Sequence, residues 1–394
     1  MILSHNNLLS YKSAVKLISL CLLISCSTQT NTEWKDSFKV LQKSTAPDLR
    51  VELFEYSESD NTIVFKTDKK EHLPILTSFS KENKLNASIS LLPDSTILPN
   101  SHGIVVLSVG NIRTKPGHSQ EMATQTLMGT PIKILEKKGG WYRVQTPDYY
   151  IGWTEDDTFI RVNDEELNDW IHTEKLIFTE NYGLLYMDRD SNSDIVTDLT
   201  GGNILKKITQ TKTHTKVELA DKRSGWLPNT SVSALSKWKE NNKPNADQLL
   251  KTAQRFMGVP YLWGGTSFKG VDCSGFTKMT YYSHGVQLPR DASQQVTVGQ
   301  VVETDTTLIN LEPGDLLFFG DHATELKPEK VTHVGIYMGD GKMIHSSGRV
   351  RIESLVRGTP TFTEYRLKTF LSARRMLNSV GKDGVIPVQS LLSY

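Results

Sequence analysis

The residues of this chain that could carry covalent chemistry lie in its last third. Cys273 stands in the segment Val-Asp-Cys-Ser-Gly, and two histidines follow it, His333 in Thr-His-Val-Gly and His345 in Ile-His-Ser-Ser. A thiol becomes a good nucleophile when a base takes its proton, and the base works best when a third group fixes its ring. The order Cys, His, His supplies all three groups, so the sequence predicts a cysteine peptidase.

Each of these residues also has a structural explanation. Cys273 could be an ordinary buried cysteine, but it opens a predicted helix, where free N–H groups and the helix dipole favour the thiolate. A lone histidine among apolar strand residues is usually a core residue. With a nucleophile available, His333 is better interpreted as the general base, which takes the thiol proton and later protonates the leaving amine.

The position of His345 depends on the turn at residues 339–341. A two-residue Asp-Gly turn would pair His345 with Ile336, facing away from His333. A three-residue turn would place His345 opposite Gly335, diagonal to His333 and on the same face of the sheet, about 7–8 Å apart. We predict the three-residue turn, with His345 orienting the base.

The N-terminus predicts export. Residues 1–26 contain Lys12 and Lys16, an apolar run at 17–25 and then Cys26, which is typical of a secretory signal and too short for a good membrane span. The tetrad Leu-Ile-Ser-Cys resembles a bacterial lipobox, so we expect lipid on Cys26 and a protein anchored to the bacterial cell envelope, facing the periplasm. An ordinary cut nearby is the alternative. With Cys26 acylated, Cys273 has no partner for a disulfide.

Composition excludes some functions. The chain has 45 basic and 44 acidic residues, a net charge of +1. This balance lacks the excess of basic residues that is typical of nucleic-acid-binding proteins. Its cysteines and histidines give no ligand pair at zinc-site spacing, so we expect no metal and no cofactor. The length indicates two to four domains, and we expect a monomer.

The order of segments predicts an α+β protein with several domains. After the signal, residues 27–100 read as a tether and a small α/β extension, with strands at 50–56 and 62–66 and a helix at 73–79. Residues 101–235 contain a repeat of 73 residues that predicts two small β-barrels or sandwiches, at 101–165 and 166–235. The repeat pairs Gly129 with Gly202, Val144 with Val217, and the Gly-Trp at 152–153 with that at 225–226. Residues 236–245 are polar and read as a linker.

The predicted catalytic domain covers residues 246–378, with a tail at 379–394. Asn245 can cap a first helix, with Gln248 as its reciprocal partner. The Tyr-Leu-Trp-Gly-Gly loop at 261–265 precedes a second helix that starts at Cys273. Strands are predicted at 315–319, 331–338, 342–345 and 349–353. A helix bearing the nucleophile, followed by an antiparallel sheet bearing the base, is the papain-like plan.

Five short strings carry a family resemblance. They are Tyr-Leu-Trp-Gly-Gly at 261–265, Asp-Cys-Ser-Gly-Phe at 272–276, Leu-Pro-Arg-Asp at 288–291, Pro-Gly-Asp-Leu at 313–316 and His-Val-Gly-Ile-Tyr at 333–337. In this order they resemble the NlpC-type papain-like cell-wall peptidases over roughly 245–376, and the upstream units resemble bacterial SH3-like domains. The whole is similar to γ-D-glutamyl-L-diamino-acid endopeptidases, also called dipeptidyl-peptidase VI. The resemblance implies cleavage of peptidoglycan stem peptides between D-Glu and the diamino acid, which releases L-Ala-γ-D-Glu.

The resemblance also implies roles for the residues around the nucleophile. Tyr261 would place its hydroxyl beside the developing oxyanion, and Ser274 would line the site, while Trp263 is assigned to packing. Asp291, otherwise a helix cap, and Glu121 would bind the free α-amine of the substrate's L-Ala, and Tyr150 would clamp it. Two acids at one end of the groove demand a cation there, so we expect action on released peptides with a free L-Ala, not on intact wall.

Other functions remain open. The chain could be a wall-binding lipoprotein with an idle catalytic domain, although the nucleophile and the base are both present. It could also hydrolyse intact cross-linked wall, in which case the acids that bind the amine would have no role. A permuted thiol acyltransferase is excluded because its histidine precedes its cysteine in the chain.

Overall fold

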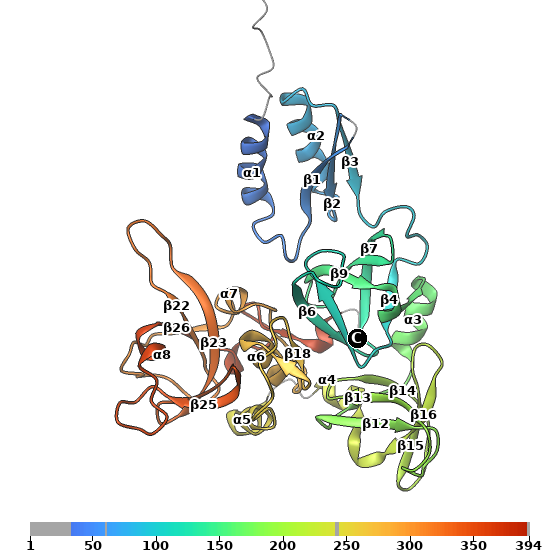
Figure 1. The fold of residues 1–394 in the computed structure, drawn as a ribbon, viewed down its shortest axis with the longest axis vertical. Coiled ribbons are helices and arrows are strands. Elements are labelled where there is room, and N and C mark those ends of the chain that lie inside the picture. Colours follow the sequence, from blue (N-terminus) through green and yellow to red (C-terminus); the bar gives the residue numbers. More distant parts are fainter. Residues whose placement is uncertain (1–32, 60, 241–243, 392–394) are drawn as a thin grey trace, which may run out of the picture.

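The computed structural model describes residues 33–59, 61–240 and 244–391 (Figure 1). The predicted signal segment and Cys26 lie outside these ranges. Within them, no helix combines the length and the apolar character that crossing a membrane requires.

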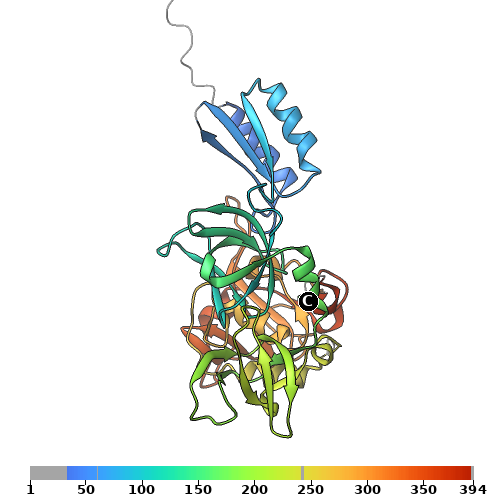
Figure 2. The ribbon, with the colours of Figure 1, turned by 90° about the vertical axis from the view of Figure 1, so that its right-hand side faces the viewer.

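The N-terminal extension is a small α/β unit that projects from the rest of the molecule (Figure 2). Its sheet has the order β1-β2-β3, with β2 and β3 parallel, and aromatic residues fill its core. The prediction of a strand from residue 50 is wrong, because β1 begins at Phe54 and residues 46–53 form a loop. Helix α1 was not predicted, while Pro74 sits in the first turn of α2 as expected. The bounds are α1 Glu33–Thr45, β1 Phe54–Ser59, β2 Thr62–Thr67, α2 His72–Glu82 and β3 Ala87–Leu91.

Two sheets with the same topology follow, which confirms the predicted repeat. The first has the order β10-β4-β7-β8-β9-β5-β6, and the second runs β17-β11-β14-β15-β16-β12-β13. The first comprises β4 His102–Val105, β5 Val109–Arg113, β6 Met122–Leu127, β7 Pro131–Lys138, β8 Trp141–Gln145, β9 Ile151–Glu155 and β10 Phe159–Val162. The second comprises β11 Lys175–Phe178, β12 Tyr182–Tyr186, β13 Ile195–Thr200, β14 Ile204–Gln210, β15 His214–Glu218, β16 Ser224–Pro228 and β17 Val232–Ala234.

The sheets are not closed into barrels, which corrects one alternative of the sequence analysis. The free edge of β6 instead meets the catalytic domain, where the Gln125 N–H donates to Thr266 Oγ1 at 3.1 Å. The equivalent glycines of the repeat, Gly129 and Gly202, both have positive φ, and a Cβ on Gly129 would lie 2.1 Å from the Ile204 carbonyl oxygen. Only glycine therefore allows the two sheets to approach this closely.

The predicted boundaries between domains fall inside helices. The boundary at 165/166 lies within α3 (Asp164–His172), which connects the two sheets. The predicted linker begins within α4 (Leu235–Glu240). This helix is not a free linker, because Leu235 and Trp238 are buried against the catalytic domain. Part of the C-terminal tail also packs on that domain, where β27 (Ile386–Pro387) pairs with β20 (Val286–Gln287).

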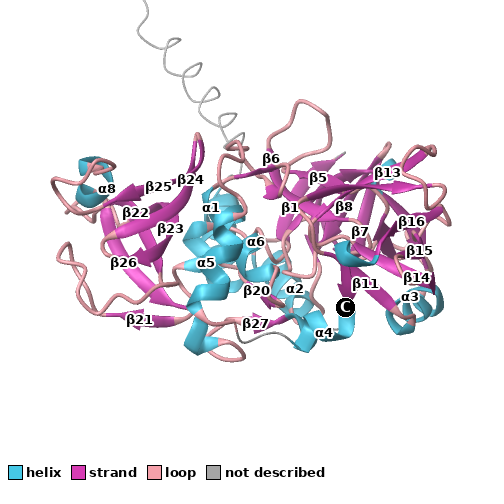
Figure 3. Cartoon of the chain, turned by 90° about the horizontal axis from the view of Figure 1, so that it is seen from below, coloured by secondary structure: helices cyan, strands magenta, loops and turns pink. Residues whose placement is uncertain are grey.

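The catalytic domain follows the predicted plan. Helix α5 (Ala246–Gln254) has the expected capping box of Asn245 and Gln248. Helices α5 and α6 lie between the large sheet and the SH3-like units (Figure 3). The sheet has the order β21-β26-β22-β23-β24-β25 and is antiparallel throughout. The remaining elements are β18 Thr266–Ser267, β19 Gly270–Val271, α6 Cys273–Tyr282, α7 Ala292–Gln295, β21 Gln300–Val302, β22 Leu316–Asp321, β23 Lys330–Gly339, β24 Lys342–Ser347, β25 Arg349–Ser354, α8 Glu364–Lys368 and β26 Phe370–Arg375.

The hairpin of β23 and β24 has the predicted register but not the predicted turn. Ile336 pairs with Ile344, so the register places Gly335 opposite His345, and the irregularity lies between Tyr337 and Gly339. The turn is the two-residue Asp-Gly type, with positive φ at both residues. A β-bulge before the turn supplies the extra residue and restores the register.

Candidate active site

Helix α6 presents Cys273 at its first position. Asp272 caps the helix by accepting the Gly275 N–H at 2.7 Å, and it also accepts the Gly264 N–H at 2.9 Å from the loop before β18. The buried guanidinium of Arg290 donates to both carboxylate oxygens of Asp272, at 2.6 and 3.1 Å. One carboxylate thus fixes the helix start, the neighbouring loop and the segment before α7.

The thiol lies against strand β23. Burial raises the pKa of Cys273 to about 11, and Asp272 acts in the same direction. The backbone N–H groups of Val334 and Ser274 oppose this by hydrogen bonding to the sulfur. The helix start therefore lowers the pKa as expected, but burial outweighs it and the resting thiol keeps its proton. Val334 follows His333 directly, so the sulfur sits beside the strand position of the base.

The two histidines are in contact on the same face of the sheet. His333 Nε2 and His345 Nδ1 are 2.7 Å apart, and both rings are buried. His345 Nε2 lies 3.1 Å from Glu353 Oε2 on β25, and Arg351 pairs with the other oxygen of Glu353 at 2.5 Å. Burial lowers the pKa of His333 well below 6.5, and the charge of nearby Arg366 adds to this effect. Burial also lowers the pKa of His345, although Glu353 opposes the shift.

These distances favour one arrangement of the protons, although His345 Nε2 and Glu353 Oε2 are close without forming a hydrogen bond of good geometry. The Glu353 carboxylate can only accept, so it favours the His345 tautomer with its proton on Nε2. His345 Nδ1 is then an acceptor, and His333 must carry its proton on Nε2. The remaining nitrogen of His333, Nδ1, is left as a base. The row of Glu353, His345 and His333 therefore delivers a neutral imidazole that is able to accept the thiol proton.

The other predicted residues gather around one cavity of about 450 Å³ beside the thiol. Tyr261 is half-buried there, and burial together with the neighbouring Cys273 raises its pKa, so its hydroxyl remains a hydrogen-bond donor. Ser274 lines the cavity and accepts from Arg290 Nη1 at 3.1 Å. Trp263 is 61% exposed and donates to Glu121 Oε1 at 2.8 Å, so its assignment to packing is wrong.

Asp291, which also lines this cavity, contacts Tyr150 and Arg50. Tyr150 OH donates to Asp291 Oδ2 at 3.0 Å, and the same oxygen lies 2.8 Å from Arg50 Nη1. Arg50 also donates to Ser293 Oγ at 2.9 Å. The structure thus joins Tyr150 to Asp291, places Glu121 in the lining of the same cavity, and adds an arginine from the N-terminal extension.

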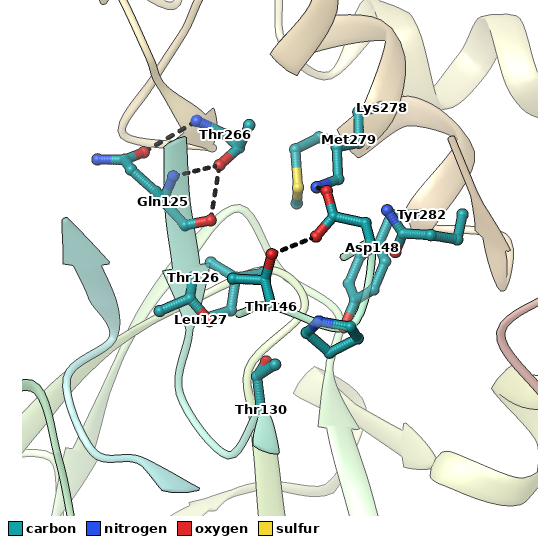
Figure 4. A pocket seen from close by; sticks show the side chains of 12 residues that line it. Gln125, Thr126, Leu127, Thr130, Thr146, Asp148, Thr266, Lys278, Met279 and Tyr282 are labelled. Atoms are coloured by element: carbon teal, nitrogen blue, oxygen red, sulfur yellow. Dashed lines mark hydrogen bonds and ion pairs between the residues drawn. The ribbon is translucent and has the colours of Figure 1, made fainter. Parts of the chain in front are cut away.

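A tight interface fixes the first SH3-like unit against the catalytic domain (Figure 4). Asp148 and Lys278 form an ion pair that is almost completely buried, and Thr146 donates to Asp148 at 2.6 Å. Burial alone would raise the pKa of Asp148, but Lys278 holds it below its ordinary value. Gln125 and Thr266 exchange hydrogen bonds at 2.9 and 3.1 Å. These contacts hold Glu121 and Tyr150, which come from the same unit, at fixed positions over the cavity.

Sequence reasoning missed three residues of the site. Glu353 was predicted only as a strand residue, although its place in β25 beside the strand of His345 could have indicated a partner for that ring. Arg290 appeared only within the Leu-Pro-Arg-Asp string, and nothing in that string indicates its ion pair with Asp272. Arg50 gave no signal, because more than two hundred residues separate it from Asp291. Among the residues that the structure describes, no group of three or more His, Cys, Asp and Glu side chains is arranged to hold a metal ion.

Comparisons with known proteins agree with this geometry. The model of the NlpC/P60 family matches residues 258–371, and that of the bacterial dipeptidyl-peptidase Sh3 domain matches residues 112–158. The chain is 31% identical over 268 residues to the gamma-D-glutamyl-L-lysine dipeptidyl-peptidase of Bacillus cereus, covering 66% of this chain and 77% of that protein. The protein of the same name from Bacillus subtilis is 29% identical over 253 residues, covering 62% of this chain and 78% of that protein.

A solved structure shows the same architecture. The crystal structure of an NlpC/P60 family protein from Bacillus cereus superimposes with a TM-score of 0.60 and 26% identity, covering 70% of this chain and 100% of that one. The fold is thus the papain-like one, with mixed helix and sheet. The chain therefore belongs to the NlpC/P60 family of cell-wall cysteine peptidases, and it carries a dipeptidyl-peptidase type of SH3 domain before its catalytic domain.

Proposed function

We propose that the protein hydrolyses the γ-D-Glu–diamino acid bond of peptidoglycan stem peptides whose L-Ala has a free amine. The observation that carries this proposal is that two carboxylates, Asp291 and Glu121, line the same cavity as the Cys273 thiol, together with Tyr150. An ammonium group fits the Glu121 carboxylate, which has no cationic partner among the described residues, whereas the amide of an acylated L-Ala offers it no charge. The similarity to the Bacillus dipeptidyl-peptidases supports the same substrate class.

The proposed mechanism assigns a residue to each step. His333 Nδ1 takes the proton as the Cys273 sulfur attacks the γ-carbonyl carbon, and a tetrahedral oxyanion forms. The Cys273 N–H belongs to the first turn of α6 and has no intrahelical acceptor, so it can stabilise this oxyanion together with the Tyr261 hydroxyl. The His333 proton then passes to the leaving amine and a thioester remains. Water hydrolyses the thioester with His333 again acting as the base, which restores the thiol.

The biological setting is a second part of the proposal. We infer that the mature protein is exported and held at the membrane by lipid on Cys26, where it degrades stem peptides already released from the wall. The lipobox-like tetrad supports the anchor, and the requirement for a free L-Ala supports turnover or recycling. Metabolic labelling with a fatty acid in the parent organism should mark the full chain and not a Cys26→Ala variant. An unlabelled wild-type chain would contradict the anchor.

The decisive experiment compares two peptides. The fragment from residue 33 onward is incubated with L-Ala-γ-D-Glu-diamino acid and with its N-acetylated form, and the products are identified by mass spectrometry. We expect release of L-Ala-γ-D-Glu from the free peptide and at least hundredfold slower cleavage of the acetylated one. Cys273→Ala is the inactive control. Equal turnover of both peptides would contradict the specificity and favour a hydrolase of intact wall.

A further inference from the structure

Asp291, in the lining of the cavity, already holds a cation that belongs to the chain. Arg50 Nη1 lies 2.8 Å from Asp291 Oδ2, which also accepts the Tyr150 hydroxyl. Among the contacts of the described residues, the Glu121 carboxylate accepts only from the neutral indole of Trp263, so its charge remains for a substrate ammonium. Arg50 comes from the loop between α1 and β1, so the N-terminal extension forms part of the site.

Arg50 is held rigidly. Its guanidinium donates to Asp48 through two parallel hydrogen bonds, from Nε to Oδ1 at 2.7 Å and from Nη2 to Oδ2 at 2.8 Å. The Gln294 side chain donates to Asp48 at 2.7 Å, and the Arg50 carbonyl accepts the Ile151 N–H at 2.7 Å. A planar guanidinium held by such a fork has little freedom to move aside.

The Asp48–Arg50 pair separates two cavities. Arg50, Asp291 and Ser293 line the cavity of about 450 Å³ that contains Cys273. Asp48 and Gln294, which bond to each other, line a second cavity of about 650 Å³ between the extension, the first SH3-like unit and the catalytic domain. Volumes of about 300–1,000 Å³ accommodate ordinary ligands, so the second cavity has room for a group attached to L-Ala.

We propose that Arg50 is a specificity-determining residue that closes the groove beyond the substrate's L-Ala. This proposal rests on the proposed function and explains how acylated stems are rejected by shape as well as by charge. With Arg50 in place, an acyl group on L-Ala meets the guanidinium and the carboxylates that it bridges. Without Arg50, the groove continues into the second cavity, which can accommodate the acyl group.

The test is the ratio of kcat/KM for the N-acetylated tripeptide to kcat/KM for the free tripeptide. We expect Arg50→Ala to raise this ratio at least tenfold, and Asp48→Asn, which releases the fork, to raise it by a smaller factor. Arg223→Ala is the matched control, because Arg223 is also 38% exposed and pairs with an aspartate two residues earlier, Asp221, in the second SH3-like unit. Its ratio should equal that of the wild type.

A second measurement covers variants that are poorly active or unstable. In the Cys273→Ala background, calorimetric Kd values for the two peptides should show the same change in preference, and thermal unfolding shows whether each variant is folded. A folded Arg50→Ala or Asp48→Asn variant with the wild-type ratio in both assays, or with a lower one, would overturn the role of Arg50. If the wild type fails to cleave the free tripeptide, the proposed function itself fails, which is a different result.

Discussion

At the scale of single residues, the site works by controlling which atoms hold protons. The pKa of Cys273 is raised to about 11 and that of His333 is lowered well below 6.5. In the proposed mechanism the resting pair is therefore a neutral thiol and a neutral imidazole, and the proton moves during the attack. In this arrangement the tautomer of His333 matters more than the acidity of the thiol, so the residues behind the ring become important.

In the proposed mechanism, Glu353 is the residue that favours this tautomer. We expect Glu353→Ala to lower kcat by about tenfold to a hundredfold, because a hydrogen bond to a charged group is worth about 1.5–3 kcal/mol. Glu353→Gln retains an acceptor oxygen and should restore part of the rate, while KM should change little in both variants. A folded Glu353→Ala variant with wild-type kcat would show that the carboxylate does not position the base.

The same proton positions predict the pH dependence. The base must be neutral, so kcat/KM should fall only as the pH drops through the lowered pKa of His333, below 6.5. On the alkaline side, the free stem peptide loses its ammonium near its α-amino pKa of about 8, and kcat/KM should fall there too. Rate profiles between pH 4 and 10 test both limbs. An acid limb at or above pH 6.5 would contradict the neutral, buried imidazole.

At the scale of elements, the start of α6 depends on a glycine. A Cβ on Gly275 would lie 1.9 Å from the Gly265 carbonyl oxygen, which is backbone and cannot move aside without shifting the loop that carries Tyr261. We expect Gly275→Ala to lower stability by several kcal/mol, about the range of severe core changes, and to abolish activity. Chemical denaturation and a peptidase assay measure the two effects. Gly140→Ala is the control, since a Cβ there has no neighbour within 4 Å.

The elements that the sequence predicted are those whose signals are local. The capping box of Asn245 and the register that brings His345 to His333 both follow from neighbouring residues. The turn of that hairpin was wrong, because a two-residue Asp-Gly turn and a β-bulge at Met338 produce the register expected from a longer turn. Helix α1 and the buried part of the linker were missed, since their apolar residues face partners distant in the sequence.

The site residues also divide into those with a local sequence signal and those that depend on distant contacts. Cys273 and His333 stand in recognisable strings, whereas Arg50 acts only through a fold that brings the N-terminal extension to the catalytic domain. Contacts between residues so far apart leave no periodicity in a single sequence. The closing of the groove could therefore not have been predicted from the residues that surround the nucleophile.

At the scale of the whole molecule, the cavity is built by three parts of the chain, and it exists only while they stay docked. The extension supplies Arg50, the first SH3-like unit supplies Glu121 and Tyr150, and the catalytic domain supplies the remaining residues. The buried pair of Asp148 and Lys278 lies at the centre of this docking. Substrate selection should therefore respond to changes at an interface that does not touch the substrate.

Changing one partner of that pair should be far more harmful than changing both. Asp148→Ala leaves Lys278 buried without its counter-charge, and we expect a loss of about 3–5 kcal/mol in stability. The double variant Asp148→Leu/Lys278→Met should recover most of it, because a well-packed apolar pair can replace a buried ion pair. Unfolding in urea measures both, and Asp36→Ala, at the exposed pair with Lys39, should cost only about 0–1 kcal/mol.

The kinetic outcome separates docking from general stability. Tyr150 follows Asp148 by two residues, so loosening the interface should raise KM for the free stem peptide in the Asp148→Ala variant before any unfolding is detectable. The double variant should return KM toward the wild-type value. If Asp148→Ala is destabilised but keeps its KM, then the SH3-like unit holds the fold without shaping the amine end. Glu121 and Tyr150 would then have no part in choosing the substrate.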